Sequence, residues 1–254
     1  MKPNAMIIHA SGTNRDHDVA RALELAGAQP EIVHINALRD GKRRLSDYQM
    51  MVLPGGFSYG DDLGAGKLWA VALRSRLGDD LDEFIDLGHP VIGICNGFQA
   101  LVKSGLLPAL NGSAHQQATL THNESGRFEC RWIGLEPNPA GKSFWTIGLD
   151  EAIYCPVAHG EGRFVASDET LEAIEDQGLV ALRYSVVGPA YPANPNGSAN
   201  NIAGITNPRG NVLGLMPHPE NHIVATQHPG RHRGESGGSG LPLFKNGVEH
   251  ASLL

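Results

Sequence analysis

The chain has little cysteine, no excess of basic residues and no long apolar run. Its three cysteines, Cys95, Cys130 and Cys155, form no disulfide framework and no paired-cysteine zinc pattern, so a reducing, cytoplasmic setting fits best. The 20 basic residues are outnumbered by 27 acidic ones, and they form no basic stripe of the kind that binds nucleic acid. The apolar stretches are too short to span a bilayer, and residues 1–6 lead into a strand-like run, which is not the pattern of a signal peptide.

What remains is a chain of 254 residues, 41% of them hydrophobic, which is ample for a packed core. We expect a single α/β domain over residues 1–254, with a loop-rich C-terminal extension from about residue 222.

Strand-like and helix-like segments alternate through the first part of the chain. We expect strands at 5–10, 31–35, 48–53 and 91–94, and helices at 16–26, 69–77 and 80–87. This alternation predicts an open, mostly parallel sheet with helices on both faces. The second half has strand-like runs at 127–132, 153–158, 179–185 and 212–216 but only one helix, at 169–177, which predicts some antiparallel pairing. In such sheets the functional site lies at the carboxyl ends of the strands.

The most informative segment is residues 91–99, where an apolar strand enters Gly93-Ile-Cys95-Asn-Gly97 and continues as an amphipathic helix. This pattern predicts a nucleophile elbow, a strained strand-to-helix turn with Cys95 at its tip. The two glycines allow neighbouring backbone to pass close by. The N-terminus of the helix favours the thiolate, which is the nucleophilic form. A buried structural cysteine needs none of these features, so we interpret Cys95 as catalytic.

A second polar segment, Pro217-His218-Pro219-Glu220, follows the apolar run 212–215. A cysteine hydrolase needs a base for the thiol proton and a carboxylate that holds the imidazole in one tautomer. We expect His218 and Glu220 to fill these roles, because alternation in an extended segment places both side chains on one face. A surface loop that contains both residues by chance is the plainer alternative.

The third segment is the glycine-rich turn that begins at Pro54. Acyl transfer needs backbone donors at the point where the oxyanion forms. We expect the N–H groups of Gly56 and of Asn96, the residue after the nucleophile, to form this oxyanion hole. Two adjacent glycines would suit a plain turn equally well.

Metal binding is a weaker hypothesis. His218, His222, His228 and His232 lie close together in the sequence, but the neighbouring prolines break the helix that paired ligands would use. We therefore expect no metal in this chain. A solvated turn explains the acidic pair in Gly60-Asp61-Asp62 better than a cation site does, and Gly64-x-Gly66 lacks the context of a dinucleotide site.

Taken together, the elbow and the segment Pro217–Glu220 resemble those of class I (triad) glutamine amidotransferases. Four further stretches resemble one family among them, the glutaminase subunits of phosphoribosylformylglycinamidine synthase. The four are Pro54-Gly-Gly-Phe-Ser-Tyr-Gly-Asp61, Asn123-Glu-Ser-Gly-Arg-Phe128, Pro156-Val-Ala-His-Gly-Glu-Gly-Arg-Phe164 and Asn194-Pro-Asn-Gly-Ser198. The resemblance covers the chain from the first strand to Glu220 and implies a flavodoxin-like fold.

The resemblance implies that Cys95 attacks the carboxamide of glutamine and forms a glutamyl thioester, with His218 protonating the departing ammonia and Glu220 orienting it. Ammonia would then pass to a large synthetase subunit, aided by a small assembly subunit, in purine biosynthesis. ATP and magnesium would belong to that partner, and this chain would need no cofactor. The matching positions that would form the glutamine pocket are Gly55, Phe57, Gln99, His159 and Gly160. His159 has an alternative role as a satisfied polar residue near the sheet edge.

Two departures from the family pattern concern the surface. Asn221 stands where the family usually has Arg, and the tail 222–254 is longer than in short members. Other hypotheses are a DJ-1-like peptidase, a dienelactone hydrolase and a binding module that has lost its activity. In hydrolases of the dienelactone type the acid precedes the histidine, whereas here it follows. A DJ-1-like enzyme would have His where this chain has Asn96, and an inactive module would have lost Cys95, His218 or Glu220.

Overall fold

The computed structural model describes residues 1–112, 115–185 and 193–254. The strands are β1 (Asn4–His9), β2 (Gln29–His34), β3 (Met50–Leu53), β4 (Val91–Ile94), β5 (Ala118–Thr121), β6 (Glu129–Pro137), β7 (Ile153–His159), β8 (Arg163–Ala166), β9 (Val180–Tyr184), β10 (Ile202–Thr206) and β11 (Val212–Leu215). The α-helices are α1 (Asp16–Ala26), α2 (Ile35–Arg39), α3 (Lys67–Asp86), α4 (Asn96–Lys103), α5 (Asp168–Asp176) and α6 (Leu241–Ala251).

Within the described residues, nine strands form one sheet in the order β2-β1-β3-β4-β11-β10-β9-β6-β7. Neighbours from β2 to β11 pair in parallel, and those from β11 to β7 pair antiparallel. The expected α/β fold, with a parallel sheet and antiparallel strands from the second half, is confirmed. Strands β5 and β8 form a separate antiparallel ribbon.

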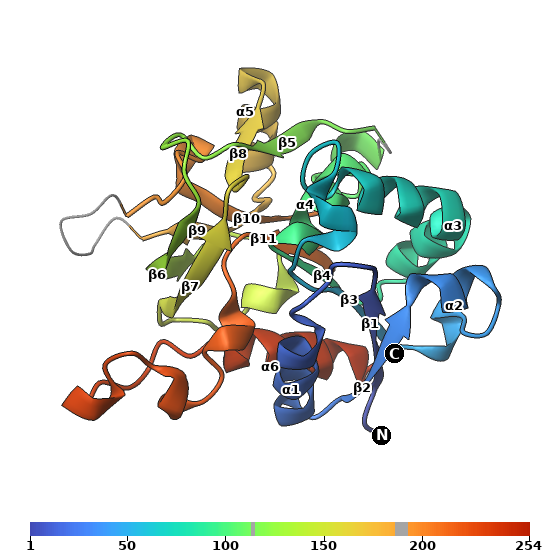
Figure 1. The fold of residues 1–254 in the computed structure, drawn as a ribbon, viewed down its shortest axis with the longest axis horizontal. Coiled ribbons are helices and arrows are strands. Elements are labelled where there is room, and N and C mark those ends of the chain that lie inside the picture. Colours follow the sequence, from blue (N-terminus) through green and yellow to red (C-terminus); the bar gives the residue numbers. More distant parts are fainter. Residues whose placement is uncertain (113–114, 186–192) are drawn as a thin grey trace.

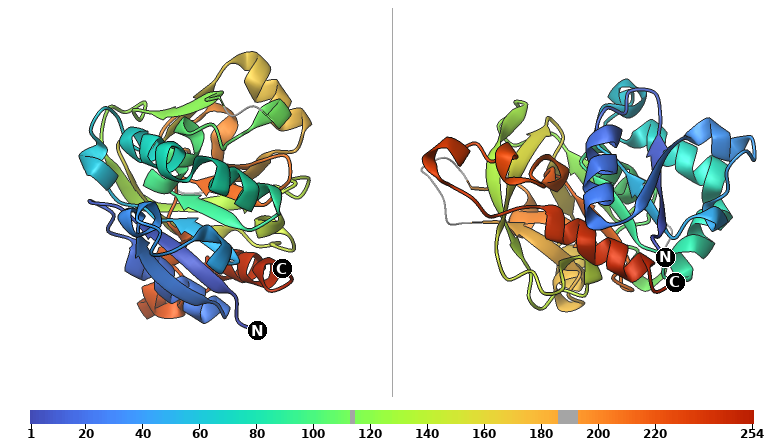
Figure 2. Two further views of the ribbon diagram at one scale, coloured as in Figure 1. Left: turned by 90° about the vertical axis from the view of Figure 1, so that its right-hand side faces the viewer. Right: turned by 90° about the horizontal axis from the view of Figure 1, so that it is seen from below.

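Helices cover both faces of the parallel half (Figure 1). Helices α1 and α6 pack against each other on one face, while α3 and α4 pack on the other. Figure 2 shows α6 running alongside the N-terminal strand and helix. Strands β3, β4 and β11 are buried along their whole length because they are sandwiched between these two layers. Apolar residues at every position are the sequence mark of such a strand.

The prediction of two helices at 69–77 and 80–87 is wrong, since α3 is one continuous helix. Gly78 lies at the expected break, and glycine costs about 1 kcal/mol in a helix interior. Buried Leu73 and Leu77 before it and Leu81 and Phe84 after it lie on one face, so packing outweighs that cost.

The C-terminal tail contains a helix that the sequence analysis did not predict. Pro242 lies in the first turn of α6, where its missing N–H costs nothing, and Leu243, Phe244 and Val248 are buried. The preceding loops lie against β6 and β7. The ring of His222 contacts that of Trp132, and the ring of His228 contacts those of Trp132 and Tyr154, with centroid distances of 5.4 to 6.3 Å.

Candidate active site

Cys95 lies between β4 and α4 in a strained backbone conformation, with φ 51° and ψ −105°. A non-glycine residue with positive φ is uncommon, and it persists only where the surroundings fix it. Those surroundings need glycine: a Cβ at Gly97 would lie 2.0 Å from the carbonyl oxygen of Leu53, and one at Gly93 would lie 2.7 Å from the oxygen of Gly97. The predicted strained turn is confirmed.

His218 and Glu220 are brought to this turn by the sheet. Strand β11 pairs in parallel with β4, with Leu215 opposite Ile94, so both segments leave the sheet at the same edge. The Nδ1 of His218 lies 2.7 Å from the Oε1 of Glu220, and only 2% and 0% of these residues are exposed. The expectation of an extended segment is wrong, because Pro219 starts a 3₁₀ turn (Pro219–Asn221) that brings the two side chains together.

The electrostatics of the site favour a protonated His218. Burial alone would lower the pKa of the imidazole, but the negative charges of Glu220 and Cys95 act against it and raise the pKa of His218 to about 10. Among the described residues, the Nε2 of His218 has no partner at hydrogen-bonding geometry. The thiol of Cys95 is directed instead to the carbonyl oxygen of Ala158, at 3.7 Å. Cys95 and His218 therefore lie close enough to interact electrostatically, while the thiol is directed to Ala158.

The turn after β3 forms a further wall of the site. Gly55 lies beside His218, since a Cβ there would come within 2.7 Å of the imidazole Cε1. Gly56 has φ 145° and forms an antiparallel bridge with Thr13. The bridge is made by the N–H groups of Phe57 and Asn14, so in the described part of the chain the N–H of Gly56 has no backbone acceptor. The same holds there for the N–H of Asn96, the first residue of α4. Both predicted oxyanion donors are thus available.

The residues expected to form the glutamine pocket lie in two different environments. Gln99 is buried, and its amide already binds the Asn96 side chain and the carbonyl oxygen of Glu161. Phe57 is 49% exposed, and its ring centroid lies 6.4 Å from that of Phe128. A Cβ at Gly160 would lie 3.8 Å from the Phe128 ring. Phe57 and Gly160 therefore lie at the rim of the candidate site, whereas Gln99 lies in the packed interior of the protein.

His159 fits the alternative of a satisfied polar residue. Its Nδ1 lies 3.1 Å from Oδ1 of Asn123, and its Nε2 lies 3.4 Å from Nδ2 of Asn196. Burial, reinforced by the positive charge of His218, lowers the pKa of His159 to about 4. The imidazole is therefore neutral and occupied on both nitrogens.

Asn123 and Asn196 are structural members of the site to which the sequence analysis gave no role. Asn123 also binds the carbonyl oxygens of Arg127 and His159 and the N–H of Gly162. Asn196 binds the carbonyl oxygen of Gly162 and the hydroxyl of Tyr184. The sequence signal that could have identified them is that each lies in one of the four stretches that resemble the family.

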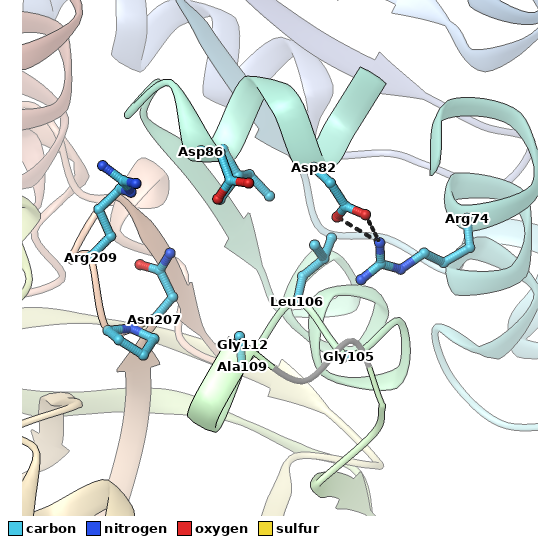
Figure 3. A pocket seen from close by; sticks show the side chains of 11 residues that line it. Arg74, Asp82, Asp86, Gly105, Leu106, Ala109, Gly112, Asn207 and Arg209 are labelled. Atoms are coloured by element: carbon cyan, nitrogen blue, oxygen red, sulfur yellow. Dashed lines mark hydrogen bonds and ion pairs between the residues drawn. The ribbon is translucent and has the colours of Figure 1, made fainter. Parts of the chain in front are cut away.

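No cluster of three or more His, Cys, Asp or Glu among the described residues is arranged to hold a metal ion. A large cavity of about 620 Å³ lies at the amino ends of β4 and β11, the edge of the sheet away from Cys95 (Figure 3). Among its lining residues, Arg74 binds Asp82, and the amide of Asn207 donates to Asn211 behind the wall. It is not the catalytic pocket.

An open α/β sheet with a cysteine elbow beside a His–Glu pair is the construction of a triad-type cysteine hydrolase. Comparison with known proteins places the chain more closely. The family model for the CobB/CobQ-like glutamine amidotransferase domain matches residues 2–251. Phosphoribosylformylglycinamidine synthase subunit PurQ of Treponema denticola is 49% identical, over 98% of this chain and 99% of the relative. The subunit of the same name from Dehalococcoides mccartyi is 44% identical, over 98% of each chain.

Among solved structures, a chain of PurLQS from Thermotoga maritima superposes with a TM-score of 0.74 at 35% identity, covering 98% of this chain and 99% of that one. The chain belongs to the family of PurQ glutamine amidotransferases. The resemblance found in the sequence is confirmed. In the described part of the chain, no helix is both long and apolar enough to pass through a membrane.

Proposed function

We propose that this chain is the glutaminase subunit of a phosphoribosylformylglycinamidine synthase, and that Cys95, His218 and Glu220 are its catalytic triad. The observation that carries the proposal is the His218–Glu220 pair, 2.7 Å apart, at the end of the strand beside the Cys95 elbow. A buried imidazole held by a carboxylate next to a strained cysteine is the arrangement that covalent catalysis by a thiol requires.

In the first step, the Cys95 sulfur attacks the carboxamide carbon of glutamine. The negative oxygen that forms is stabilised by the N–H groups of Gly56 and Asn96. The protonated His218 then gives its proton to the departing nitrogen, so that ammonia leaves and a glutamyl thioester remains. Water, deprotonated by His218, attacks the thioester, and glutamate and the thiolate are released.

The raised pKa of His218 supports this order of events. With a pKa of about 10, the imidazole carries its proton at neutral pH. A thiolate has no proton to donate to the Ala158 oxygen, so the sulfur is free to turn from that carbonyl toward the imidazolium. His218 is therefore ready to act as an acid when the carbon–nitrogen bond breaks.

The ammonia is used by a partner. Relatives of this chain are named as subunits of phosphoribosylformylglycinamidine synthase, and one solved relative comes from PurLQS. We propose that this chain likewise delivers ammonia to a large synthetase subunit, with a small assembly subunit in the complex. The large synthetase subunit uses ATP and magnesium to replace the amide oxygen of formylglycinamide ribonucleotide by nitrogen. We propose a cytoplasmic location, since the three cysteines are free.

We further propose that residues 1–254 form one domain. The continuity of the sheet supports this, because β11 from the second half lies between β4 and β10. The tail is part of the same unit, since α6 packs on α1 and on the 3₁₀ turn that holds Glu220.

The test is release of glutamate from glutamine by the purified chain, alone and with its synthetase partners, ATP and formylglycinamide ribonucleotide. We expect the partners to stimulate release and Cys95→Ala to abolish it, while Cys130→Ala, on the exposed side of β6, leaves it unchanged. Glutamate release that survives Cys95→Ala would refute the triad. Absence of release in every mixture would favour another cysteine hydrolase activity.

A further inference from the structure

The side chain of Asn96 has no part in the steps above, yet it is almost completely buried beside the nucleophile. It makes three hydrogen bonds. Its Oδ1 accepts one from the N–H of Ser58 at 3.0 Å, and its Nδ2 donates to Oδ1 of Asp61 at 2.9 Å and to Oε1 of Gln99 at 3.0 Å. Two of the three bonds therefore reach the turn after β3, residues 54–61, which we call the oxyanion loop.

The oxyanion loop depends on contacts from outside. Tyr59 and Asp61 have φ values of 59° and 54°, in the left-handed region that non-glycine residues rarely adopt. On one side, the turn after β1 holds the loop: the hydroxyl of Ser58 lies 2.8 Å from that of Thr13, and the N–H of Phe57 donates to Gly12. On the other side, Asn96 supplies the contacts. The loop conformation, and with it the position of the Gly56 N–H, is fixed between these two supports.

The chemistry of this contact requires an amide at position 96. A backbone N–H can only donate, so Ser58 needs an acceptor, whereas an ionised Asp61 needs a donor. The Asn96 side chain offers one of each in the required directions. An apolar side chain would leave both Ser58 and Asp61 without these partners inside the protein, and a carboxylate would face that of Asp61.

The Asn96 side chain is also held in place by Gln99. Gln99 accepts from Asn96 and donates through Nε2 to the carbonyl oxygen of Glu161, at 2.7 Å. Glu161 lies in the turn after β7, and its carboxylate accepts from the N–H of Ala65 at 3.2 Å. One continuous set of hydrogen bonds thus joins the elbow helix, the oxyanion loop and the turn after His159.

We propose that Asn96 is a positioning residue: its side chain holds the oxyanion loop so that the N–H of Gly56 and the N–H of Asn96 itself point to the same oxyanion. This role rests on the proposed function and names a determinant of its rate. Since the oxyanion exists only during reaction, loss of the hydrogen bonds from the Asn96 side chain to the oxyanion loop lowers kcat far more than it changes KM.

The test uses glutaminase kinetics of the complex with the synthetase partners. Asn96→Ala is expected to lower kcat about 100-fold, the scale of losing an oxyanion donor, with KM changing less than about threefold. The matched control is Asn138→Ala, which removes an amide that makes two backbone hydrogen bonds away from the site and is expected to leave kcat unchanged.

A charge exchange tests the specific contact. Asn96→Asp places two carboxylates together and is expected to lower kcat at least as far as Asn96→Ala does. Adding Asp61→Asn restores a donor opposite an acceptor, so the double variant is expected to regain about tenfold over Asn96→Asp. The recovery is partial because Gln99 still faces a carboxylate. If Asn96→Asp does not fold, Asp61→Ala removes the acceptor without altering the elbow and is expected to lower kcat about tenfold.

Alkylation of Cys95 by iodoacetamide, followed by peptide mass spectrometry, separates this role from damage to the elbow. The reaction forms no oxyanion, so its rate is expected to stay within about threefold of wild type in Asn96→Ala. Unchanged kcat in Asn96→Ala, equal losses in alkylation and kcat, or no recovery in the double variant would each overturn the proposal. Loss of glutaminase in the wild-type complex would instead refute the proposed function itself.

Discussion

Gly55 and His218 are in such close contact that a single methyl group could not be placed between them: a Cβ at Gly55 would lie 2.7 Å from Cε1 of the imidazole. The backbone of the oxyanion loop therefore sets one limit on the position of the ring, and the carboxylate of Glu220 sets another. His218 is held between the loop that we propose to stabilise the oxyanion and the carboxylate that we propose to orient the imidazole.

Gly55→Ala is expected to displace the imidazole and lower kcat about 10- to 100-fold, because small misplacements of a catalytic group are costly. The control is Gly78→Ala in α3, where a Cβ would meet no atom within 4 Å. That change is expected to leave kcat unaltered and to stabilise the helix slightly. Steady-state kinetics and urea unfolding of both variants provide the comparison. A Gly55→Ala enzyme with the wild-type kcat would contradict the predicted displacement of the imidazole.

The pH dependence of glutaminase activity follows from His218. Because its pKa is raised to about 10, the acid form is present at neutral pH, and activity is expected to fall as the pH rises through about 10. Glu220→Gln removes one of the charges that raise this pKa. The alkaline limb of kcat/KM is then expected to move at least one pH unit lower, together with a fall in the maximum. Identical alkaline limbs in the wild-type and Glu220→Gln proteins would argue against Glu220 as the partner of His218.

Stability in acid should report on His159. Its pKa in the folded protein is lowered to about 4, so between about pH 4 and 6.5 the unfolded chain holds a proton that the folded chain excludes. The free energy of unfolding therefore falls as the pH drops through this window, by up to about 3 kcal/mol. Urea unfolding at several pH values is expected to show a shallower fall for His159→Gln. Replacing exposed His232 by Gln should leave the slope unchanged, and equal slopes for all three proteins would disprove the assignment.

Thiol labelling should separate the three cysteines. Alternation along β6 directs Cys130 to solvent, whereas Cys155 on β7 is fully buried. A bulky maleimide is expected to label Cys130 quickly and Cys155 only after unfolding. Cys95, which is 5% exposed, should react slowly. A fast labelling phase that persists in Cys130→Ser would contradict this order.

Local sequence patterns were sufficient to predict which residues the fold brings together at the candidate site. The elbow needs two glycines and a cysteine within five residues, and His218 and Glu220 are separated by a single proline. Strands such as β10 gave no such signal, since Ile202–Thr206 is short and contains a glycine. Its strand conformation depends on β9 and β11 on either side.

The partners of the polar residues around the triad could not be predicted either. The sequence predicted Gln99 and His159 as pocket residues, but it does not reveal which distant groups occupy their hydrogen-bonding atoms. His159 is satisfied by Asn123 and Asn196, which reach it from loops on either side in the sequence. Only the folded chain shows that such residues have little capacity left for substrate.

The place of β11 in the sheet has a consequence for the order in which the protein matures. Strand β11 comes after the other described strands in the sequence, and so is synthesised after them, yet it occupies the centre of the sheet, between β4 and β10. Until it emerges, the nascent chain carries two unpaired strand edges of the kind that invite aggregation. It also carries the cysteine without its histidine. Synthesis of β11 therefore completes the sheet, and His218 of the proposed triad follows directly, so a chain that ends before this strand lacks the proposed acid and base for release of ammonia.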